Sequence, residues 1–438
     1  MRRHMIRSEA KSMKKFLFIW AGQFFSILGS GISAFGLSIW VLQNTGNTTS
    51  FAMTVALSTL PVVIFAPMAG SLADRKNRKH IIIVSDSLDL LIKILVIITI
   101  LTGNLKLWIV YILNFVSSAL ATFQSPAFAA TIPLIVPKDN LERANGLSQL
   151  RGAVMNILIP SAAGLLYPVT GLSGLFVVDF LTYMIGMATI LISSIPQNIK
   201  QEEKEEKQGV LKDTVEAFQY IKSKAGFLSF LVAASLINFF ASVINVIIDP
   251  MVMEHGNTRI LGFVNSGAGI GLLIGGILAS VFPPKGNKIR IMSLSMLLSG
   301  LGLIIMGINP SWYVIGGGLF IAMLPLPYVN GSALTIMQKK IASEYHGRTF
   351  SLVGAVSQML MPVGAVFAGL LSDGIFIPLL REDGALAHTF VGDIIGTGAT
   401  RGMGLLSIVC GFCVIAVCIY LFTNKTISSI ETRLPDAE

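Results

Sequence analysis

Ionisable residues stand inside long apolar runs of this sequence. The run over residues 80–102 carries Asp86, Asp89 and Lys93, and the spacing of i, i+3 and i+7 puts all three on one face of a helix. A charge in hydrocarbon costs at least about 2.5–3.5 kcal/mol on insertion scales, so such residues are expected to pair or to face a cavity. Lys93 can pair with Asp89 one helical turn away, which would neutralise both and make them structural.

Three more ionisable residues, Arg151, Asp179 and Asp249, lie in other apolar runs. Asp86, Asp179 and Asp249 are candidate proton carriers, because a carboxyl group that is desolvated in one conformation and hydrated in another changes its proton affinity. For Asp179 and Asp249 the alternative is ordinary solvation near the membrane surface. Asp86 could also contact the basic loop at residues 70–79. Arg151 could pair with Asp86 or Asp89, or contact an anionic group of a solute.

Two apolar runs carry polar stripes at helical spacing, each within a narrow arc of the helix surface. The stripe in the run over residues 16–42 consists of Gln23, Ser26, Ser30 and Ser33. The stripe in the run over residues 226–253 consists of Asn238, Ser242, Asn245 and Asp249. Hydrogen bonds between helices would explain the serines. The asparagines and the aspartate favour a cavity lining, and their low charge density suits a large amphipathic solute better than a small ion.

The other reactive residue types form no recognisable site. The five histidines lie in tails or loops, with no pair at ligand spacing, and are His4, His80, His255, His346 and His388. The three cysteines share one apolar run near residue 414, where neither a disulfide framework nor a zinc site is expected. No G-x-x-x-x-G-K-[ST] segment occurs, so ATP hydrolysis has no support. We therefore expect no catalytic residues, no metal and no cofactor, and an integral-membrane enzyme is the weaker alternative.

The composition of the chain indicates which kind of secondary structure carries the ionisable and polar residues described above. The chain has 438 residues, of which 53% are hydrophobic and only 13% charged; a soluble protein has about a quarter charged residues. A bilayer core about 30 Å thick requires about 20 apolar residues per helix, and twelve such runs occur. The sequence thus predicts an all-α integral membrane protein with twelve transmembrane helices, at residues 16–42, 49–72, 80–102, 107–129, 144–168, 172–195, 226–253, 260–282, 289–308, 311–337, 349–372 and 402–423.

Lysine and arginine are distributed unequally between the two sides that these helices define. Twenty-six of the 32 lie in the tails and in the loops on the side of the N-terminus, and four lie in the opposite loops. Because basic loops stay in the cytoplasm, both termini are expected there, in a bacterial plasma membrane. The net charge of +9 then faces anionic membrane lipid, and nucleic-acid binding loses its support.

The chain is expected to contain two pseudo-symmetric six-helix halves. A charged segment, IPQNIKQEEKEEKQG, separates six runs from six, and residues 210–224 are predicted to form an amphipathic surface helix. Pro126 and Pro327 are 201 positions apart, and so are Lys138 and Lys339. This shared offset indicates an internal repeat. The predicted organisation is a basic tail at 1–15, a first half at 16–195, a linker at 196–225, a second half at 226–423 and a tail at 424–438.

The loop after the second run reads GSLADRKNRK, at residues 70–79. A glycine followed by an acidic residue, an arginine and a basic cluster resembles the signature of the major facilitator superfamily. A less complete copy of this signature follows the eighth run at residues 275–290, in the segment GGILASVFPPKGNKIR. Three further segments resemble the drug-exporting branch that includes the macrolide-efflux proteins. They are FIWAGQFFSILGSGIS, SPAFAATIPLIVPKDNLERANGLSQ and GRTFSLVGAVSQMLMPVG.

The resemblance implies a twelve-helix major facilitator fold in which helices 1 and 7 line a central cavity. It implies a gate formed by Gly70, Asp74, Arg75 and Arg78 that stabilises the outward-open state. It further implies a monomeric multidrug exporter that moves hydrophobic or amphipathic compounds, macrolide-like antibiotics among them, by proton antiport and rocking of two halves. The branch's arginine in the fourth helix is absent, and its antiporter motif survives only as IPSAAG at residues 159–164. Export of an endogenous lipid or siderophore, and a transport-dead membrane sensor, are the alternatives.

Overall fold

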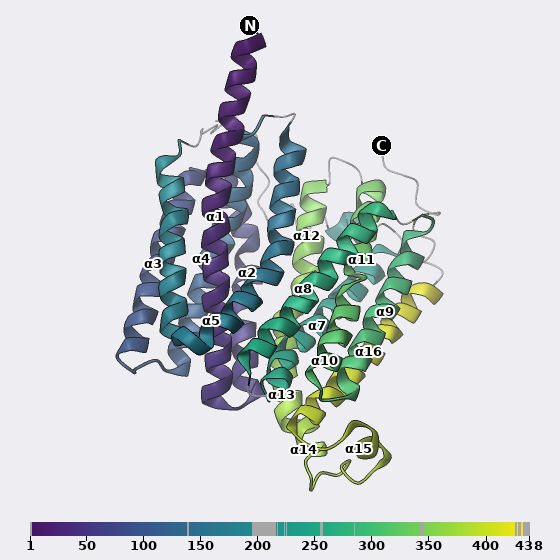
Figure 1. Ribbon diagram of the computed structural model, residues 1–438. Helices are drawn as coiled ribbons and strands as arrows, with labels where there is room; N and C mark the ends of the chain where they lie inside the picture. Colours follow the sequence, from purple (N-terminus) through teal and green to yellow (C-terminus); the bar gives the residue numbers. More distant parts are fainter. Residues whose placement is uncertain are drawn as a thin grey trace. The chain divides into compact units, whose positions relative to one another are not determined.

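The computed structural model describes residues 2–137, 140–194, 216, 218–222, 224, 226–254, 257–283, 285–341, 346–424, 427 and 431. The side chains of residues 2–12, 74, 75, 142, 145, 346–348 and 351 lie outside this description. Every regular element among the described residues is a helix (Figure 1). The first five helices are α1 (Arg2–Thr45), α2 (Thr48–Arg75), α3 (Arg78–Leu101), α4 (Leu107–Ile135) and α5 (Leu141–Ile192).

The later helices follow the charged segment of the sequence. They are α7 (Phe227–Met253), α8 (Thr258–Val281), α9 (Lys288–Ile308), α10 (Trp312–Met323), α11 (Leu326–Lys340), α12 (His346–Gln358), α13 (Met361–Leu371), a π-helical turn η3 (Ser372–Phe376), α14 (Ile377–Leu379), α15 (Phe390–Ile395) and α16 (Ala399–Thr423). Of the expected surface helix at 210–224, residues 210–215 lie outside the described part, and Glu216 and residues 218–222 are helical.

Helix α5 contains two of the predicted transmembrane segments. Its 52 residues include Gly171 with φ 64° and ψ −173°, a backbone conformation that glycine adopts without steric cost. A straight helix of this length would measure about 78 Å, more than twice the thickness of the hydrocarbon core. Gly171 therefore divides the helix between the segments expected at 144–168 and 172–195.

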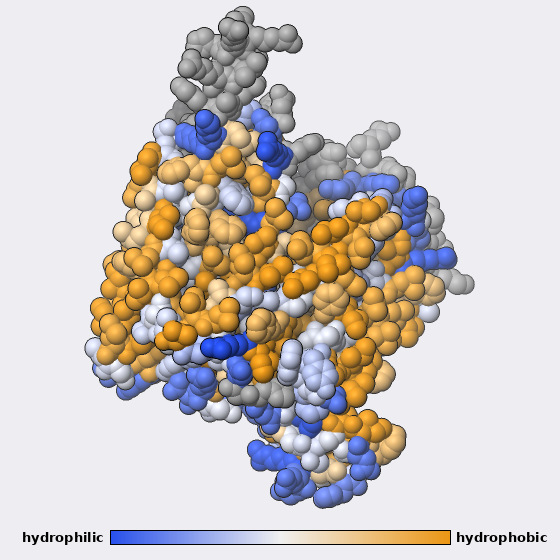
Figure 2. All heavy atoms as spheres, viewed as in Figure 1, coloured by the Kyte–Doolittle hydropathy of each residue, from blue (hydrophilic) through white to orange (hydrophobic). Residues whose placement is uncertain are grey.

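Ten helical stretches among the described residues are long and apolar enough to cross a membrane. One of them, Gly146–Ile192, holds the two segments that Gly171 divides. Helix α3 is not among the ten, because its Asp86, Asp89 and Lys93 make it too polar. With α3 and the division of α5, the helices account for the twelve predicted transmembrane segments. Figure 2 shows apolar side chains covering most of the helical surface on the face drawn, as a lipid environment requires.

The chain folds into two compact units. The first comprises Met1–Asn44 and Leu57–Glu205, and the second comprises Thr45–Ala56 and Glu206–Glu438. In this division the first turns of α2 group with the second unit. Helix α2 thus begins in the second unit and continues into the first.

The first turn of α2 is held by a carboxylate from the second unit. Asp373, in η3, accepts hydrogen bonds from the backbone N–H groups of Thr48 (3.2 Å) and Thr49 (2.7 Å) and from the Thr49 hydroxyl (2.6 Å). Gly369 lies so close that an added Cβ would be 2.7 Å from the Thr49 Cα. A carboxylate at this position satisfies N–H groups that no helical carbonyl can reach and complements the helix dipole. We call this contact the Asp373 clasp.

The segment between η3 and α16 is ordered by its own backbone hydrogen bonds. The Leu386 N–H donates to the Leu379 carbonyl (2.9 Å), and the Gly398 N–H donates to the Leu380 carbonyl (2.7 Å). In Figure 1 the segment, with α14 and α15, lies beyond the ends of α13 and α16. The structure therefore shows this segment in an ordered form.

Candidate functional site

A cavity of about 400 Å³ lies within the first unit, between α1, α2, α3, α4 and both parts of α5. Most of its wall is apolar, and polar residues from all five helices also line it. These are Gln23, Ser26, Ser30 and Ser33 from α1, Ser58 from α2, Ser85, Asp86, Asp89 and Lys93 from α3, Asn114, Ser117, Ser118 and Gln124 from α4, and Asp179 and Tyr183 from α5. The structure thus brings together the first polar stripe and the charged face of α3.

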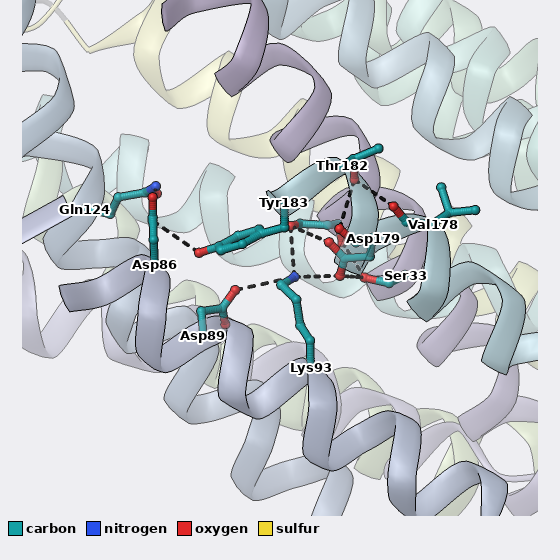
Figure 3. Close-up of polar contacts among 10 residues, drawn as sticks. Ser33, Asp86, Asp89, Lys93, Gln124, Val178, Asp179, Thr182 and Tyr183 are labelled. Carbon is teal, nitrogen blue, oxygen red and sulfur yellow. Dashed lines mark hydrogen bonds and ion pairs between the residues drawn. The ribbon is translucent and has the colours of Figure 1, made fainter. Parts of the chain in front are cut away.

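Asp179 is the most enclosed member of this group, with no exposed surface. Its Oδ2 lies 2.5 Å from the Lys93 Nζ and accepts a 2.5 Å hydrogen bond from Ser33. Its Oδ1 accepts a hydrogen bond from Ser30 (3.0 Å). Figure 3 shows Lys93 and Ser33 converging on this carboxylate. The expectation of ordinary solvation at the membrane surface is wrong for Asp179, because α1 and α3 cover it and supply its partners.

Lys93 lies between two carboxylates that come from different helices. Besides Asp179 on α5, its Nζ approaches the Oδ2 of Asp89 on α3 at 3.4 Å. It donates to the Ser30 hydroxyl (3.0 Å) and lies 4.6 Å from the centroid of the Tyr183 ring. The pairing with Asp89 that the sequence suggested is present, but Asp179 is the nearer partner. The other oxygen of Asp89, Oδ1, is buried without a hydrogen-bond partner among the described residues.

Asp86 forms a second polar centre in the same cavity. Its Oδ1 accepts hydrogen bonds from the Gln124 amide (2.6 Å) and from the Tyr183 hydroxyl (3.2 Å). The Tyr183 ring therefore connects this centre to Lys93, as Figure 3 shows. Three carboxylates and one ammonium group line the cavity, so its charge is negative when all are ionised.

Close packing between α1 and the second part of α5 brings the short serine side chains to Asp179. A Cβ added at Gly29 would be 1.9 Å from the Thr182 hydroxyl oxygen and 3.0 Å from the Asp179 Cα. A Cβ added at Gly186 would be 2.7 Å from the Ser26 Cβ. Small residues at such crossings let helix backbones approach closely in membranes. Gly29 of α1 and Gly186 of α5 are thus part of how the site is built.

Other predicted site residues lie outside this cavity. The Arg151 guanidinium carbon lies 5.8 Å from the centroid of the Phe128 ring, and neither aspartate of α3 is among the contacts that the structure gives for it. Asp249 accepts a hydrogen bond from the Asn265 amide (3.0 Å) and is buried between α7 and α8. Asp249 is therefore not the solvated surface residue of the alternative expectation.

The second polar stripe does not border the cavity of the first unit. Ser242 donates to the Met361 carbonyl (2.7 Å), which joins α7 to α13, and Asn238 donates to the Ala234 carbonyl one turn back (2.9 Å). Asn245 is exposed. Ser242 thus shows the helix-to-helix bonding that was the alternative to a cavity lining.

The predicted gate lies at the junction of α2, α3 and α4. Arg78 donates to the carbonyls of Ala73 (3.2 Å) and Ala130 (3.0 Å), so it fastens the end of α2 to α4. Gly70 has open space around it. The side chains of Asp74 and Arg75 lie outside the described part of the chain.

Sequence analysis missed several members of the site, among them Ser58 and Gln124, and above all Tyr183. It stands four residues after Asp179, so helical spacing places both on one face. That spacing was the available signal. An aromatic residue in an apolar run is ordinarily part of the core, and only the neighbouring helices reveal its contacts with Asp86 and Lys93.

Comparison with known proteins agrees with this architecture. A family model for the Major Facilitator Superfamily matches residues 19–377. Macrolide efflux protein A of Streptococcus pyogenes is 29% identical over 370 residues, which cover 82% of this chain and 90% of that protein. The enterobactin exporter EntS of Shigella boydii is 21% identical over 395 residues, which cover 84% of this chain and 92% of that protein.

A solved structure shows the same fold. A bacterial homologue of the human lysosomal transporter Spinster aligns with a TM-score of 0.71, over 96% of this chain and 97% of that chain, at 16% identity. The resemblance drawn from residues 70–79 is confirmed, and the relatives are transporters rather than enzymes. This multi-pass membrane protein belongs to the Major Facilitator Superfamily.

Proposed function

We propose that this transporter exports amphipathic compounds, macrolide-like drugs among them, and exchanges them for protons at the cavity of the first unit. The observation that carries the proposal is the enclosed Asp179 carboxylate, paired with Lys93 in the wall of a cavity that a solute can enter. A buried carboxylate in a transporter is costly unless it has a function or a partner. Here the partner is itself ionisable, so the pair can respond to a proton.

The size and charge of the cavity support a drug-like, basic solute. Sites for small molecules measure about 300–1,000 Å³ and are mostly apolar with a few placed polar groups, and this cavity of about 400 Å³ fits that range. Its excess of carboxylates favours a compound with a positive charge over an acidic one. Export of a siderophore is the second candidate, favoured by the similarity to an enterobactin exporter.

Asp179 and Asp86 are the proposed proton carriers, since both line the cavity. Asp249 lies outside the cavity and accepts a bond from Asn265 within the second unit, so we assign it a structural role. The proton gradient is the proposed energy source, with entry of a proton into the cytoplasm driving exit of the solute.

Alternating access by rocking of two halves requires contacts that hold one side shut. With both termini in the cytoplasm of a bacterial cell, the Asp373 clasp lies at the outer end of α2. The clasp lies within the second unit and fixes the first turn of α2, a helix that further along borders the cavity at Ser58. The protein is proposed to work in this way as a monomer, with Gly70, Asp74, Arg75 and Arg78 gating the cytoplasmic end.

A panel of compounds in a pump-deficient bacterial host tests the function. Cells that express the chain should tolerate basic amphipathic compounds, macrolides included, better than cells with the empty vector, and should accumulate less of them. A protonophore should remove the difference. Equal accumulation with and without the chain for every basic compound would refute drug export. Release of a catecholate siderophore by a host that lacks its own exporter would instead support the second candidate.

Replacement of Asp373 by alanine is expected to loosen the first turn of α2 and, because α2 borders the cavity at Ser58, to open the cavity more often. The loss of a capping side chain costs roughly 1 kcal/mol, which shifts a two-state population about fivefold. The readout is labelling by a membrane-impermeant maleimide at an introduced A34C, since Ala34 borders the cavity. Cells without A34C give the background from native cysteines. Asp383→Ala, at an exposed position of the same outer segment, should leave the rate unchanged, and an unchanged rate in Asp373→Ala would contradict the role of the clasp.

A further inference from the structure

The Lys93 ammonium group faces two carboxylates, Asp179 and Asp89, which differ in whether their oxygens can accept a further hydrogen bond. Asp179 is fully enclosed, and both of its oxygens have partners. Asp89 retains a small exposed fraction, 13% of its side chain, and its buried Oδ1 has no hydrogen-bond partner among the described residues. A buried polar atom without a partner requires an explanation, because leaving it so costs free energy. A group of the solute is a natural partner, since Asp89 lines the cavity.

We propose that Lys93 makes the binding of a proton at Asp179 and the binding of a basic solute at Asp89 mutually exclusive. The inference rests on the proposed function and adds the means by which proton and solute exchange. While Asp179 is ionised, it holds Lys93 at 2.5 Å, and Asp89 can accept the protonated amine of a solute. Once Asp179 takes up a proton, its attraction for Lys93 is lost. Lys93 then moves from its present 3.4 Å into full contact with Asp89 and neutralises the carboxylate that the amine would use.

The charges balance in both states. With the solute bound, Asp179 pairs with Lys93 and Asp89 pairs with the amine. With the proton bound, Asp179 is neutral and Asp89 pairs with Lys93. One proton and one monovalent cation therefore exchange without a change in the charge of the site, which matters because net charge is expensive in a low-dielectric interior.

The surroundings of Lys93 allow this exchange to be controlled by Asp179. Among the described residues, the titratable groups that line the cavity are Asp86, Asp89, Lys93, Asp179 and Tyr183, and the described side chains that α1, α2 and α4 contribute to it are neutral. Asp86 is occupied by hydrogen bonds from Gln124 and Tyr183. Lys93 also contacts the Ser30 hydroxyl and the Tyr183 ring, so both carboxylates and these two groups surround its ammonium.

Binding of erythromycin, a macrolide with a basic amine, to the purified full-length protein at a series of pH values tests the proposal. For wild type, affinity should fall as the pH is lowered, by up to tenfold per pH unit for one competing proton. Asp179→Asn mimics the protonated form, so it should bind roughly ten- to a hundredfold more weakly at neutral pH. Its affinity should also no longer depend on pH.

The decisive variant is the double substitution K93M/D179N. It removes the ammonium group that would otherwise occupy Asp89, so it should recover the affinity that Asp179→Asn loses and remain independent of pH. Asp89→Asn should bind weakly at every pH. Asp249→Asn, which alters a buried carboxylate outside this cavity, should keep both the affinity and the pH dependence of wild type.

The proposal is overturned if K93M/D179N binds no better than Asp179→Asn, or if Asp179→Asn keeps the pH dependence of wild type. Failure of wild type to bind erythromycin would overturn Asp89 as an amine site. Each of these results would leave proton-driven export intact if the cell panel still showed sensitivity to a protonophore. Loss of that sensitivity would instead count against the proposed function itself.

Discussion

Replacement of Asp179 by asparagine is expected to abolish proton-driven export. The amide keeps the size of the side chain, and its one oxygen can still accept a hydrogen bond from Ser30 or Ser33, which donate to separate oxygens of Asp179, but it cannot take up and release a proton. Cells that express the variant should accumulate exported compounds to the level of the empty vector. A membrane fraction should still contain the protein, because Lys93 can turn to Asp89.

Asp249→Asn provides the matched control for this result. It makes the same chemical change at another buried carboxylate, one that accepts a bond from Asn265 and does not border the cavity. Export should remain close to the wild-type level in that variant. Protonophore-sensitive efflux in Asp179→Asn, or its loss in Asp249→Asn alone, would place proton coupling elsewhere.

Replacement of Lys93 by methionine is expected to destabilise the folded protein more than any other single change at this site. It leaves Asp179 buried without its counter-ion, and removing one partner of a buried pair typically costs about 3–5 kcal/mol. Neutralising both partners is often far less costly. The double variant K93M/D179N should therefore unfold at a temperature close to that of wild type, in contrast to Lys93→Met alone. Thermal unfolding of the detergent-purified proteins measures both.

Lys106→Met is the control for Lys93→Met, and it tests whether the loss of any positive charge lowers the unfolding temperature. Lys106 is exposed at the start of α4, so its replacement should change the unfolding temperature little. If the double variant proves as unstable as Lys93→Met, the pairing of Lys93 with Asp179 is not the source of the loss.

The sequence predicted the parts of the site that lie within one helix. Asp86, Asp89 and Lys93 share a face because helical spacing requires it, and the contact between Lys93 and Asp89 followed from the same argument. The nearer partner of Lys93 lies 86 positions away on α5. No spacing rule connects residues of different helices, so the pairing with Asp179 appeared only in the fold.

The two polar stripes show a similar limit. Both met the same criteria of residue type and spacing, yet Gln23, Ser26, Ser30 and Ser33 line the cavity of the first unit, while Ser242 bonds to the α13 backbone. The difference lies in the neighbours. A hydroxyl group on an apolar helix bonds to whatever faces it, and the facing residues are set by tertiary packing rather than by the stripe itself.

Most of the architecture followed from composition and periodicity. The transmembrane segments fell near their expected positions because hydrocarbon thickness fixes their length. The break at Gly171 coincides with the expected boundary at residues 168–172. What the sequence could not reveal was that the first turn of α2 groups with the second unit, since that depends on the long-range contact of Asp373 with Thr48 and Thr49.

Simultaneous recording of proton and solute movement in proteoliposomes tests the central claim most directly. The purified protein is reconstituted with a pH-sensitive dye inside, a pH gradient is imposed, and erythromycin uptake is followed alongside the internal pH. The account predicts that protons leaving the vesicle drive erythromycin in, and that both fluxes vanish together in Asp179→Asn. Erythromycin movement in wild type that proceeds at the same rate without a gradient, and without any proton flux, would contradict it.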